Sequence, residues 1–250
     1  MSNTPKIDGT ERASPAQPQL PVREPAFNLP GSLLFILSAL VVIHVLRLYA
    51  LSADMDNELL YNFAFLPARY DYPLLEQGWA WLWSPITYSF LHGGWEHLIF
   101  NAFWLVAFGA PVARRIGPAR LAVFWCLAAP ASVAMHVAFH WGEEVIVIGA
   151  SGVVSALMGA AARFVFSPNG GIERQDAHRN ARLSIPAALS NRSVLTFAAI
   201  WLVTNYVLGS GLLGGVSATG PVAWEAHMGG FLFGFLLFGL FDANGSRRFR

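Results

Sequence analysis

The sequence has few charged residues. Aspartate, glutamate, lysine and arginine make up only 12% of its 250 residues, whereas a soluble domain carries roughly 25%. Hydrophobic residues account for 55% of the chain, and the mean hydropathy is +0.47. This composition excludes an ordinary soluble domain and predicts an integral membrane protein.

Cysteines and ligand-binding motifs are also scarce. The single cysteine, Cys126, lies in an apolar run, so disulfides do not contribute to the fold. The chain contains no phosphate loop, dinucleotide fingerprint or nucleic-acid-binding motif. We therefore expect no organic cofactor and no nucleic-acid partner. Residues 1–29 lack the apolar core and cleavage site of a signal peptide, and their polar, proline-containing composition predicts a disordered cytoplasmic tail.

Six apolar segments approach the length of about 20 residues that crosses a bilayer. They cover residues 33–51, 98–112, 121–138, 149–166, 194–213 and 223–241. The second segment is short, but it extends toward Gly94 if His97 and Asn101 face the protein interior. The sequence therefore predicts an all-α, six-transmembrane-helix bundle over residues 30–242, followed by a short basic cytoplasmic tail over residues 243–250.

The basic residues indicate an orientation in the membrane. With the N-terminus in the cytoplasm, all of the 16 basic residues except Arg47 and Arg69 fall on the inner side. Acidic residues then collect on the outer side: Asp54, Asp56, Glu58, Asp71, Glu76, Glu96, Glu143, Glu144 and Glu225. Because cytoplasmic loops carry the excess of lysine and arginine, both termini are expected in the cytoplasm.

Polar residues stand at the heads of three predicted spans. Ser151 begins the fourth span, His227 the sixth, and His97 and Asn101 the second. These three spans all run from outside to inside, so the four side chains lie at a similar depth, in the outer third of the membrane. Polar groups there are costly unless they pair or face a wet cavity. We therefore expect them to form one site.

Ser151 and His227 have the chemistry of a nucleophile and its base. A serine hydroxyl becomes reactive beside a base, and a histidine takes and returns a proton near neutral pH. Glu225 lies two residues from His227 on a helix and so points elsewhere, which favours a dyad over a triad. The alternatives are a small serine used for helix packing and a histidine that caps its helix.

Four glycines accompany the two residues. Gly149 and Gly152 let the backbone approach closely and leave room for a substrate carbonyl. Gly230 and Gly234 form a Gly-xxx-Gly step that permits close packing of another helix. The facing small positions on the fourth span are either Gly152, Ala156 and Ala160, or Ser151, Ser155 and Gly159.

The spacing of His97 and Asn101 places them on one face of a helix. Their side-chain N–H groups are donors of the kind that an acyl-transfer site needs for the oxyanion of its tetrahedral intermediate. The alternative for Asn101 is an ordinary interhelical hydrogen bond. His136 and His140 are also four residues apart, but no third ligand lies nearby in the sequence, so no metal site is expected.

These features resemble the rhomboid family of intramembrane serine proteases, over roughly residues 30–242. Three motifs carry the resemblance: His92-Gly-Gly-Trp-Glu-His97-Leu-Ile-Phe-Asn101, Gly149-Ala-Ser151-Gly152, and Ala226-His227-Met-Gly-Gly230-Phe-Leu-Phe-Gly234. Their placement on the second, fourth and sixth predicted spans also matches the family.

The resemblance implies a six-helix bundle in which a Ser151–His227 dyad opens to the extracytoplasmic side. The backbone N–H of Ser151 and the side chains of His97 and Asn101 would hold the oxyanion. Substrates would be membrane-anchored proteins, cut in or near their transmembrane segments among membrane lipids, without a metal or cofactor. The compact core suggests a bacterial inner membrane.

Three positions depart from the family pattern. A tyrosine that often stacks on the catalytic imidazole is replaced by Ser155, and the arginine of a Trp-Arg pair in the first loop is Ser84. A glutamate of the loop between the second and third spans is Ala113, although Arg115 and Gly117 remain. None of these changes removes a reacting group.

Two other functions compete with a protease. A catalytically inactive rhomboid-like protein would bind transmembrane clients, but such relatives typically lack the nucleophile or the base, and this chain has both. A transporter or channel is expected to carry charged residues near mid-membrane or an internal repeat, and neither is evident in this sequence.

Overall fold

The computed structural model describes residues 29–167, 177–210 and 223–243, whose regular secondary structure is helical. This described part contains no strand, and its one β pairing is an isolated bridge between Phe65 and Val147. The expected all-α class is therefore confirmed. The expected tails lie almost wholly outside the described residues, at positions 1–28 and 244–250.

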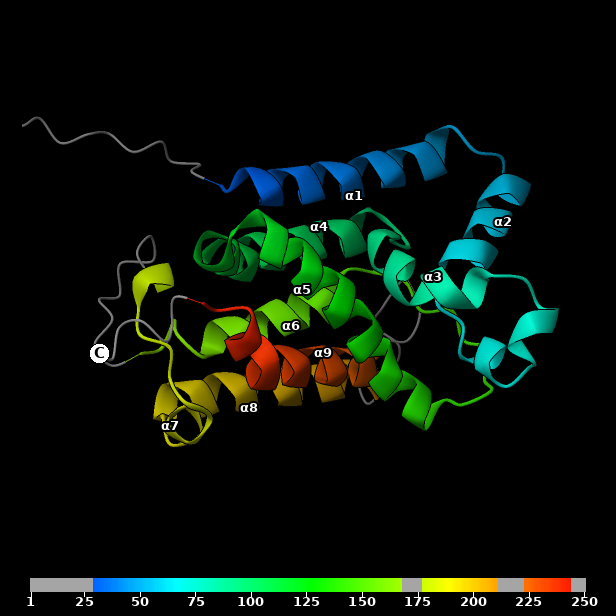
Figure 1. The fold of residues 1–250 in the computed structure, drawn as a ribbon. Helices are drawn as coiled ribbons and strands as arrows, with labels where there is room; N and C mark the ends of the chain where they lie inside the picture. Colours follow the sequence, from blue (N-terminus) through cyan, green and yellow to red (C-terminus); the bar gives the residue numbers. More distant parts are fainter. Residues whose placement is uncertain (1–28, 168–176, 211–222, 244–250) are drawn as a thin grey trace, which may run out of the picture.

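The main helices run roughly parallel, with α1 on one side of the bundle and α8 and α9 on the other (Figure 1). Their bounds are α1 Gly31–Tyr49, α2 Ala53–Phe63, α3 Ala80–Thr87, α4 Trp95–Trp104, α5 Ala110–Phe139, α6 Ser151–Ala162, α7 Ile185–Leu189, α8 Arg192–Gly209 and α9 Trp224–Leu237. A π-helical turn, Leu105–Gly109, joins α4 to α5. Side-chain caps begin three of them: Ser52 accepts from an N–H of α2, Ser184 accepts from an N–H of α7, and Asn191 accepts from two N–H groups of α8.

Three helical stretches are long and apolar enough to cross a membrane: Gly31–Tyr49, Trp95–Phe139 and Arg192–Gly209. The chain is therefore an integral membrane protein. The 45-residue stretch is broken at Gly117, whose φ of 77° and ψ of 171° are not helical. Pro118 follows the break, in the position where its fixed φ suits the start of a new helix. Two shorter apolar helical stretches are also present, Ser151–Ala162 and Trp224–Leu240.

Helix α6 lies at the centre of the bundle (Figure 1), and every one of its residues after Ser151 is buried. Its small residues let α9 come into backbone contact. A Cβ atom added to Gly230 would lie 2.0 Å from the Gly152 carbonyl oxygen, and one added to Gly234 would lie 1.8 Å from that of Ala156. Only glycine fits at such crossings. This contact fixes how the residues at the head of α6 meet those at the head of α9.

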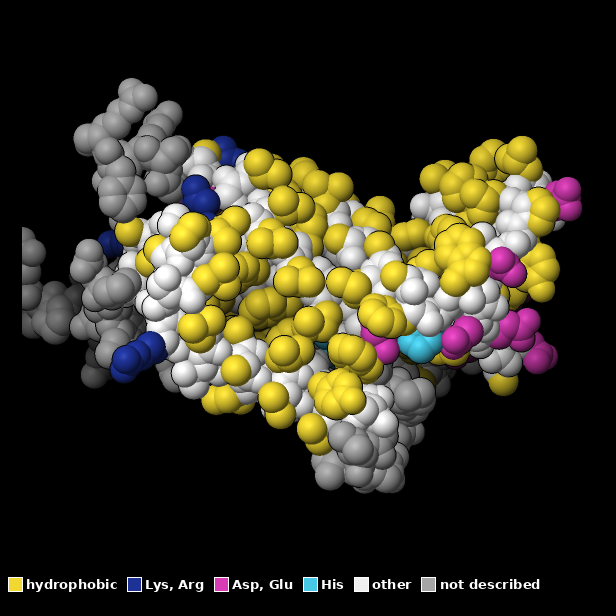
Figure 2. Space-filling model, turned by 90° about the horizontal axis from the view of Figure 1, so that it is seen from below, with side chains coloured by type: hydrophobic (Ala, Val, Ile, Leu, Met, Phe, Trp, Pro, Cys, Tyr) yellow, Lys and Arg dark blue, Asp and Glu magenta, His cyan; other side chains and the backbone are white. Residues whose placement is uncertain are grey.

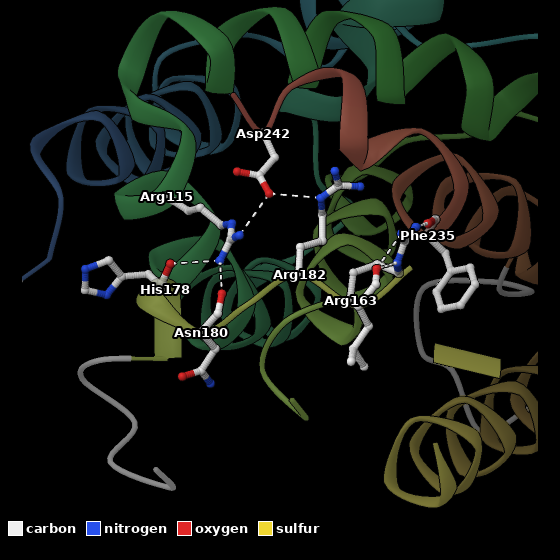
Figure 3. Close-up of polar contacts among 8 residues, drawn as sticks. Arg115, Arg163, His178, Asn180, Arg182, Phe235 and Asp242 are labelled. Carbon is white, nitrogen blue, oxygen red and sulfur yellow. Dashed lines mark hydrogen bonds and ion pairs between the residues drawn. The ribbon is translucent and has the colours of Figure 1, made fainter. Parts of the chain in front are cut away.

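A buried polar cluster connects several segments at the end of the bundle away from Ser151 (Figure 3). Arg115 of α5 forms an ion pair with Asp242, at 2.9 Å, and donates to the carbonyl groups of His178 and Asn180. Arg182 pairs with the same carboxylate at 3.1 Å. The cluster therefore joins α5, the segment before α7 and the chain just beyond α9.

Candidate active site

Ser151 is the first residue of α6 and follows a tight glycine turn. Gly149 has a φ of 122°, which residues with a side chain rarely adopt. A Cβ atom at this position would also lie 2.7 Å from Nε2 of His97. The Gly149 N–H donates to the Tyr88 carbonyl oxygen at 3.0 Å, which holds the turn in place. Because Ser151 begins the helix, its own N–H has no intrahelical acceptor.

The structure brings His227 onto Ser151. His227 lies in the first turn of α9, and its Nε2 is 2.7 Å from the Ser151 Oγ. Both residues are half-buried. The backbone contact between α6 and α9, one helical turn further along, keeps the two helix heads this close. A hydroxyl at hydrogen-bond distance from an imidazole is the arrangement that activates a serine nucleophile.

The second nitrogen of His227 contacts Asn205, which is not among the site residues predicted from the sequence. Nδ1 is 2.6 Å from Oδ1 of Asn205 on α8. The Asn205 Nδ2 donates to the Trp201 carbonyl oxygen, one turn earlier on the same helix, at 2.8 Å. The sequence signal for Asn205 is its position inside an apolar span, because polar groups at membrane depth are rare and usually functional.

These contacts determine which nitrogen of His227 carries the proton. The bond from Nδ2 to Trp201 turns Oδ1 of Asn205, an acceptor, toward the imidazole. In the neutral ring Nδ1 is therefore the donor, which leaves a lone pair on Nε2 facing the Ser151 hydroxyl. This is the tautomer that a general base needs.

His97 lies beside the glycine turn that precedes Ser151. Its Nδ1 accepts a long hydrogen bond, 3.5 Å, from the Gly93 N–H. In the neutral ring the proton therefore sits on Nε2, the atom that lies against Gly149. His97 thus presents an N–H to the same space as the head of α6.

Asn101 is buried one turn below His97. Its Nδ2 donates to the His97 carbonyl oxygen at 2.9 Å. The described part of the chain contains no hydrogen bond between Asn101 and Ser151. An amide nitrogen carries two hydrogens, so one N–H of Asn101 holds the helix and the second is available to a ligand.

His92 connects the turn to the N-terminal helices. Its Nε2 accepts from the Ala150 N–H at 3.4 Å, and its carbonyl oxygen accepts from Arg47 of α1 at 2.9 Å. Arg47 in turn forms an ion pair with Asp56 of α2 at 2.7 Å. Arg47 was one of the two basic residues that did not fit the expected inner cluster, and this pairing accounts for its position.

Ser155, the departure from the family tyrosine, is buried in α6. No aromatic ring stacks on His227 in the described part of the chain. The imidazole is held instead by hydrogen bonds at both nitrogens, to Ser151 and to Asn205.

Glu225 points away from His227, toward the end of α5. Its two carboxylate oxygens each lie 3.3 Å from a histidine nitrogen, one on His136 and the other on His140. The expectation of no metal site rested on the absence of a third ligand nearby in the sequence, and the fold brings a third potential ligand to the two histidines from a distant part of the chain.

Known proteins are similar to this chain over most of the described region. A family model for the rhomboid domain matches residues 80–242. The rhomboid protease GlpG of Yersinia pseudotuberculosis serotype I is 29% identical over 171 residues, which cover 67% of this chain and 50% of that protein. GlpG of Pectobacterium atrosepticum is 30% identical over 158 residues, covering 62% and 47%. The chain spans about half the length of these curated relatives. The extent of the domain match shows that the chain belongs to the rhomboid family.

Proposed function

We propose that this protein is an intramembrane serine endopeptidase. The observation that carries the proposal is the 2.7 Å contact between Ser151 Oγ and His227 Nε2, with the opposite nitrogen of the ring held by Asn205. The substrates would be membrane-anchored proteins, cut in or near their transmembrane segments. The names of the relatives, which are rhomboid proteases, support proteolytic activity.

In the acylation step, Ser151 Oγ attacks the scissile carbonyl carbon and its proton moves to His227 Nε2. Asn205 accepts a hydrogen bond from Nδ1–H and so stabilises the imidazolium that forms. The tetrahedral intermediate then collapses, and His227 returns the proton to the leaving amine. A water molecule repeats the sequence on the acyl-enzyme and releases the carboxylate product.

The oxyanion would lie at the head of α6. The unpaired N–H of Ser151 and the positive end of the helix dipole favour negative charge there. Nε2–H of His97 and the second N–H of Asn101 would add two donors, which strengthen as charge develops on the carbonyl oxygen. Gly149, without a side chain, leaves the space between His97 and Ser151 free for this oxygen.

We further propose six membrane spans, with the rhomboid domain over residues 30–242 and both termini in the cytoplasm. The break at Gly117 divides the 45-residue stretch into two spans, and α6 and α9 supply two more. Figure 2 supports the orientation, because Lys and Arg side chains lie at one end of the molecule and acidic side chains at the other. The site lies toward the acidic end and would face the extracytoplasmic side of a bacterial inner membrane.

Labelling with a fluorophosphonate probe tests the proposed site. We expect the wild-type protein to be labelled at Ser151 and to cleave a transmembrane reporter. Ser151→Ala should abolish both signals, and His227→Ala should reduce both by about 100-fold or more, since general-base assistance contributes at least that factor.

An inactive, client-binding protein predicts a different outcome. The wild-type chain would then bind the reporter without cutting it, and Ser151→Ala would not change binding. Cleavage that survives Ser151→Ala would overturn the assignment of the nucleophile.

A further inference from the structure

Three side chains with metal-ligating atoms meet outside the Ser151 site. His136 lies in the last turn of α5 and His140 at its C-terminal cap, while Glu225 lies in the first turn of α9. One candidate ligand atom from each lies within 4.8 Å of the other two. Glu225 comes from 85 residues beyond His140, so only the fold could reveal this group.

The imidazole of His140 lies between two carboxylates. Its Nδ1 is 2.9 Å from Oε2 of Glu143, and its Nε2 is 3.3 Å from Oε1 of Glu225. A neutral imidazole has a single N–H, so one of its nitrogens would direct a lone pair at a carboxylate oxygen. The arrangement therefore requires a positive charge, either a second proton on the ring or a cation between the ring and Glu225.

The burial of Glu225 is a second reason why a positive charge is required here. Glu225 and His136 are only 8% and 2% exposed, and burying a carboxylate without a cationic partner is costly. The second oxygen of Glu225 lies 3.3 Å from Nδ1 of His136. Among the described residues, His136 Nε2 has no hydrogen-bond partner. No contact on that side of the ring therefore offsets the negative charge of the Glu225 carboxylate.

The separations leave room for a cation, because the three candidate ligand atoms lie within 4.8 Å of one another and each histidine nitrogen faces a different oxygen of Glu225. Histidine nitrogens and carboxylate oxygens bind zinc at about 2.0–2.1 Å, which separates neighbouring ligand atoms by about 3.3 Å. Both nitrogen-to-oxygen distances around Glu225 are 3.3 Å. Glu143 would hold the other nitrogen of His140, as carboxylates commonly do for metal-bound histidines.

We propose that His136 Nδ1, His140 Nε2 and the Glu225 carboxylate form a binding site for a divalent cation with the coordination preferences of zinc. Solvent would complete the coordination, since the His140 side chain is 29% exposed. The ion would tie the end of α5 to the first turn of α9, two residues before His227.

Cobalt titration of the purified full-length protein in detergent tests the site, because Co²⁺ in a tetrahedral site has a strong visible spectrum. We expect one Co²⁺ per chain, displaced by Zn²⁺. We also expect Zn²⁺ to raise the melting temperature, because a ligand that binds only the folded state stabilises it. His140→Ala and Glu225→Gln should each weaken binding at least tenfold and remove the shift in melting temperature.

Three control variants separate this site from others. His178→Ala removes a histidine at the opposite end of the molecule and should bind Co²⁺ as the wild type does. His227→Ala should also retain binding, which places the ion away from the proposed catalytic residues. Glu143→Gln keeps all three ligands and should cause a smaller loss than His140→Ala.

Two results would overturn the proposal: no stoichiometric binding by the wild-type protein, or unchanged affinity in both His140→Ala and Glu225→Gln. In either case a second proton on His140 would supply the charge. The variants' melting temperatures without metal show whether they fold, so a loss of binding through unfolding is recognised directly.

Discussion

The imidazole of His227 has a hydrogen-bond partner at each ring nitrogen, Ser151 at Nε2 and Asn205 at Nδ1. The partner at Nδ1 matters because it selects the tautomer and the ring orientation. Ser155 cannot stack on the ring as an aromatic residue would. In this chain an amide on α8 takes over the task of orientation, as the asparagine does in Cys-His-Asn proteases.

Replacing Asn205 tests this role. In Asn205→Ala the imidazole loses the acceptor that fixes Nδ1–H and stabilises the imidazolium. A hydrogen bond to a charged group contributes roughly 1.5–3 kcal/mol, so we expect kcat for a transmembrane reporter to fall by about 10- to 100-fold with little change in KM. The rate of fluorophosphonate labelling should fall in parallel.

The neighbouring Thr204→Ala is the matched control, because Thr204 is exposed on the same helix. It should leave kcat and labelling unchanged. A purely structural role for Asn205 would instead lower the melting temperature and leave the kcat of the folded fraction intact.

Single site residues could be predicted from the sequence where a polar residue stands at the head of an apolar run. Ser151 and His227 stand at the heads of apolar runs, so sequence alone pointed to both, and the fold places them in contact. Asn205 lies inside an apolar run and was absorbed into the predicted span. The sequence relates Glu225 only to its neighbour His227, whereas in the fold its carboxylate contacts His136 and His140.

At the scale of the helices, the contact between α6 and α9 determines how the residues at the head of α6 meet those at the head of α9. The glycine pattern in the sequence predicted close packing, but two sets of facing positions were open. The structure pairs Gly230 with Gly152 and Gly234 with Ala156. Gly159, which belongs to the second set, also lies against the α9 backbone at Phe231 and Phe235, so the two sets are not exclusive.

Gly234→Ala tests this contact. The added Cβ atom would lie 1.8 Å from the Ala156 carbonyl oxygen, so the helices must separate. Overpacking of this kind typically costs about 1–3 kcal/mol. We expect a lower melting temperature in detergent and a loss of cleavage.

Gly31→Ala is the control for that variant. Gly31 begins α1, and a Cβ atom there would meet nothing within 4 Å. Its melting temperature and activity should match the wild type. Equal stability of both variants would mean that α6 and α9 are not in backbone contact.

Helix ends were less predictable than helix positions. The fourth predicted span ran to residue 166, whereas α6 ends at Ala162. The side chain of Arg163, the next residue, donates to the carbonyl oxygens of Leu183 and Phe235 (Figure 3). Hydropathy cannot anticipate such an end, because the contacts come from distant segments.

For the whole molecule, the division of charge between the two ends predicts how the chain sits in the membrane. Cysteine labelling tests this in a Cys126→Ala background. Arg120, in the first turn of the helix that follows Gly117, and Glu144, beyond the end of that helix, are both exposed. In intact spheroplasts, an impermeant maleimide should label Glu144→Cys, while Arg120→Cys should react only after permeabilisation.

The parent Cys126→Ala protein is the control and should stay unlabelled. Labelling of both cysteines from one side would contradict the proposed six spans, because the segment between them would not cross the membrane.

The backbone contact between α6 and α9 has a consequence for how this protein can vary. With no layer of side chains between the two helices, the separation of the backbones that carry Ser151 and His227 is set by main-chain contact. Side-chain substitutions elsewhere can change substrate access or substrate affinity. No side chain lies between α6 and α9 that a substitution could shorten or lengthen to adjust their separation. Variation at the crossing should therefore be nearly all-or-none, with few variants of intermediate activity.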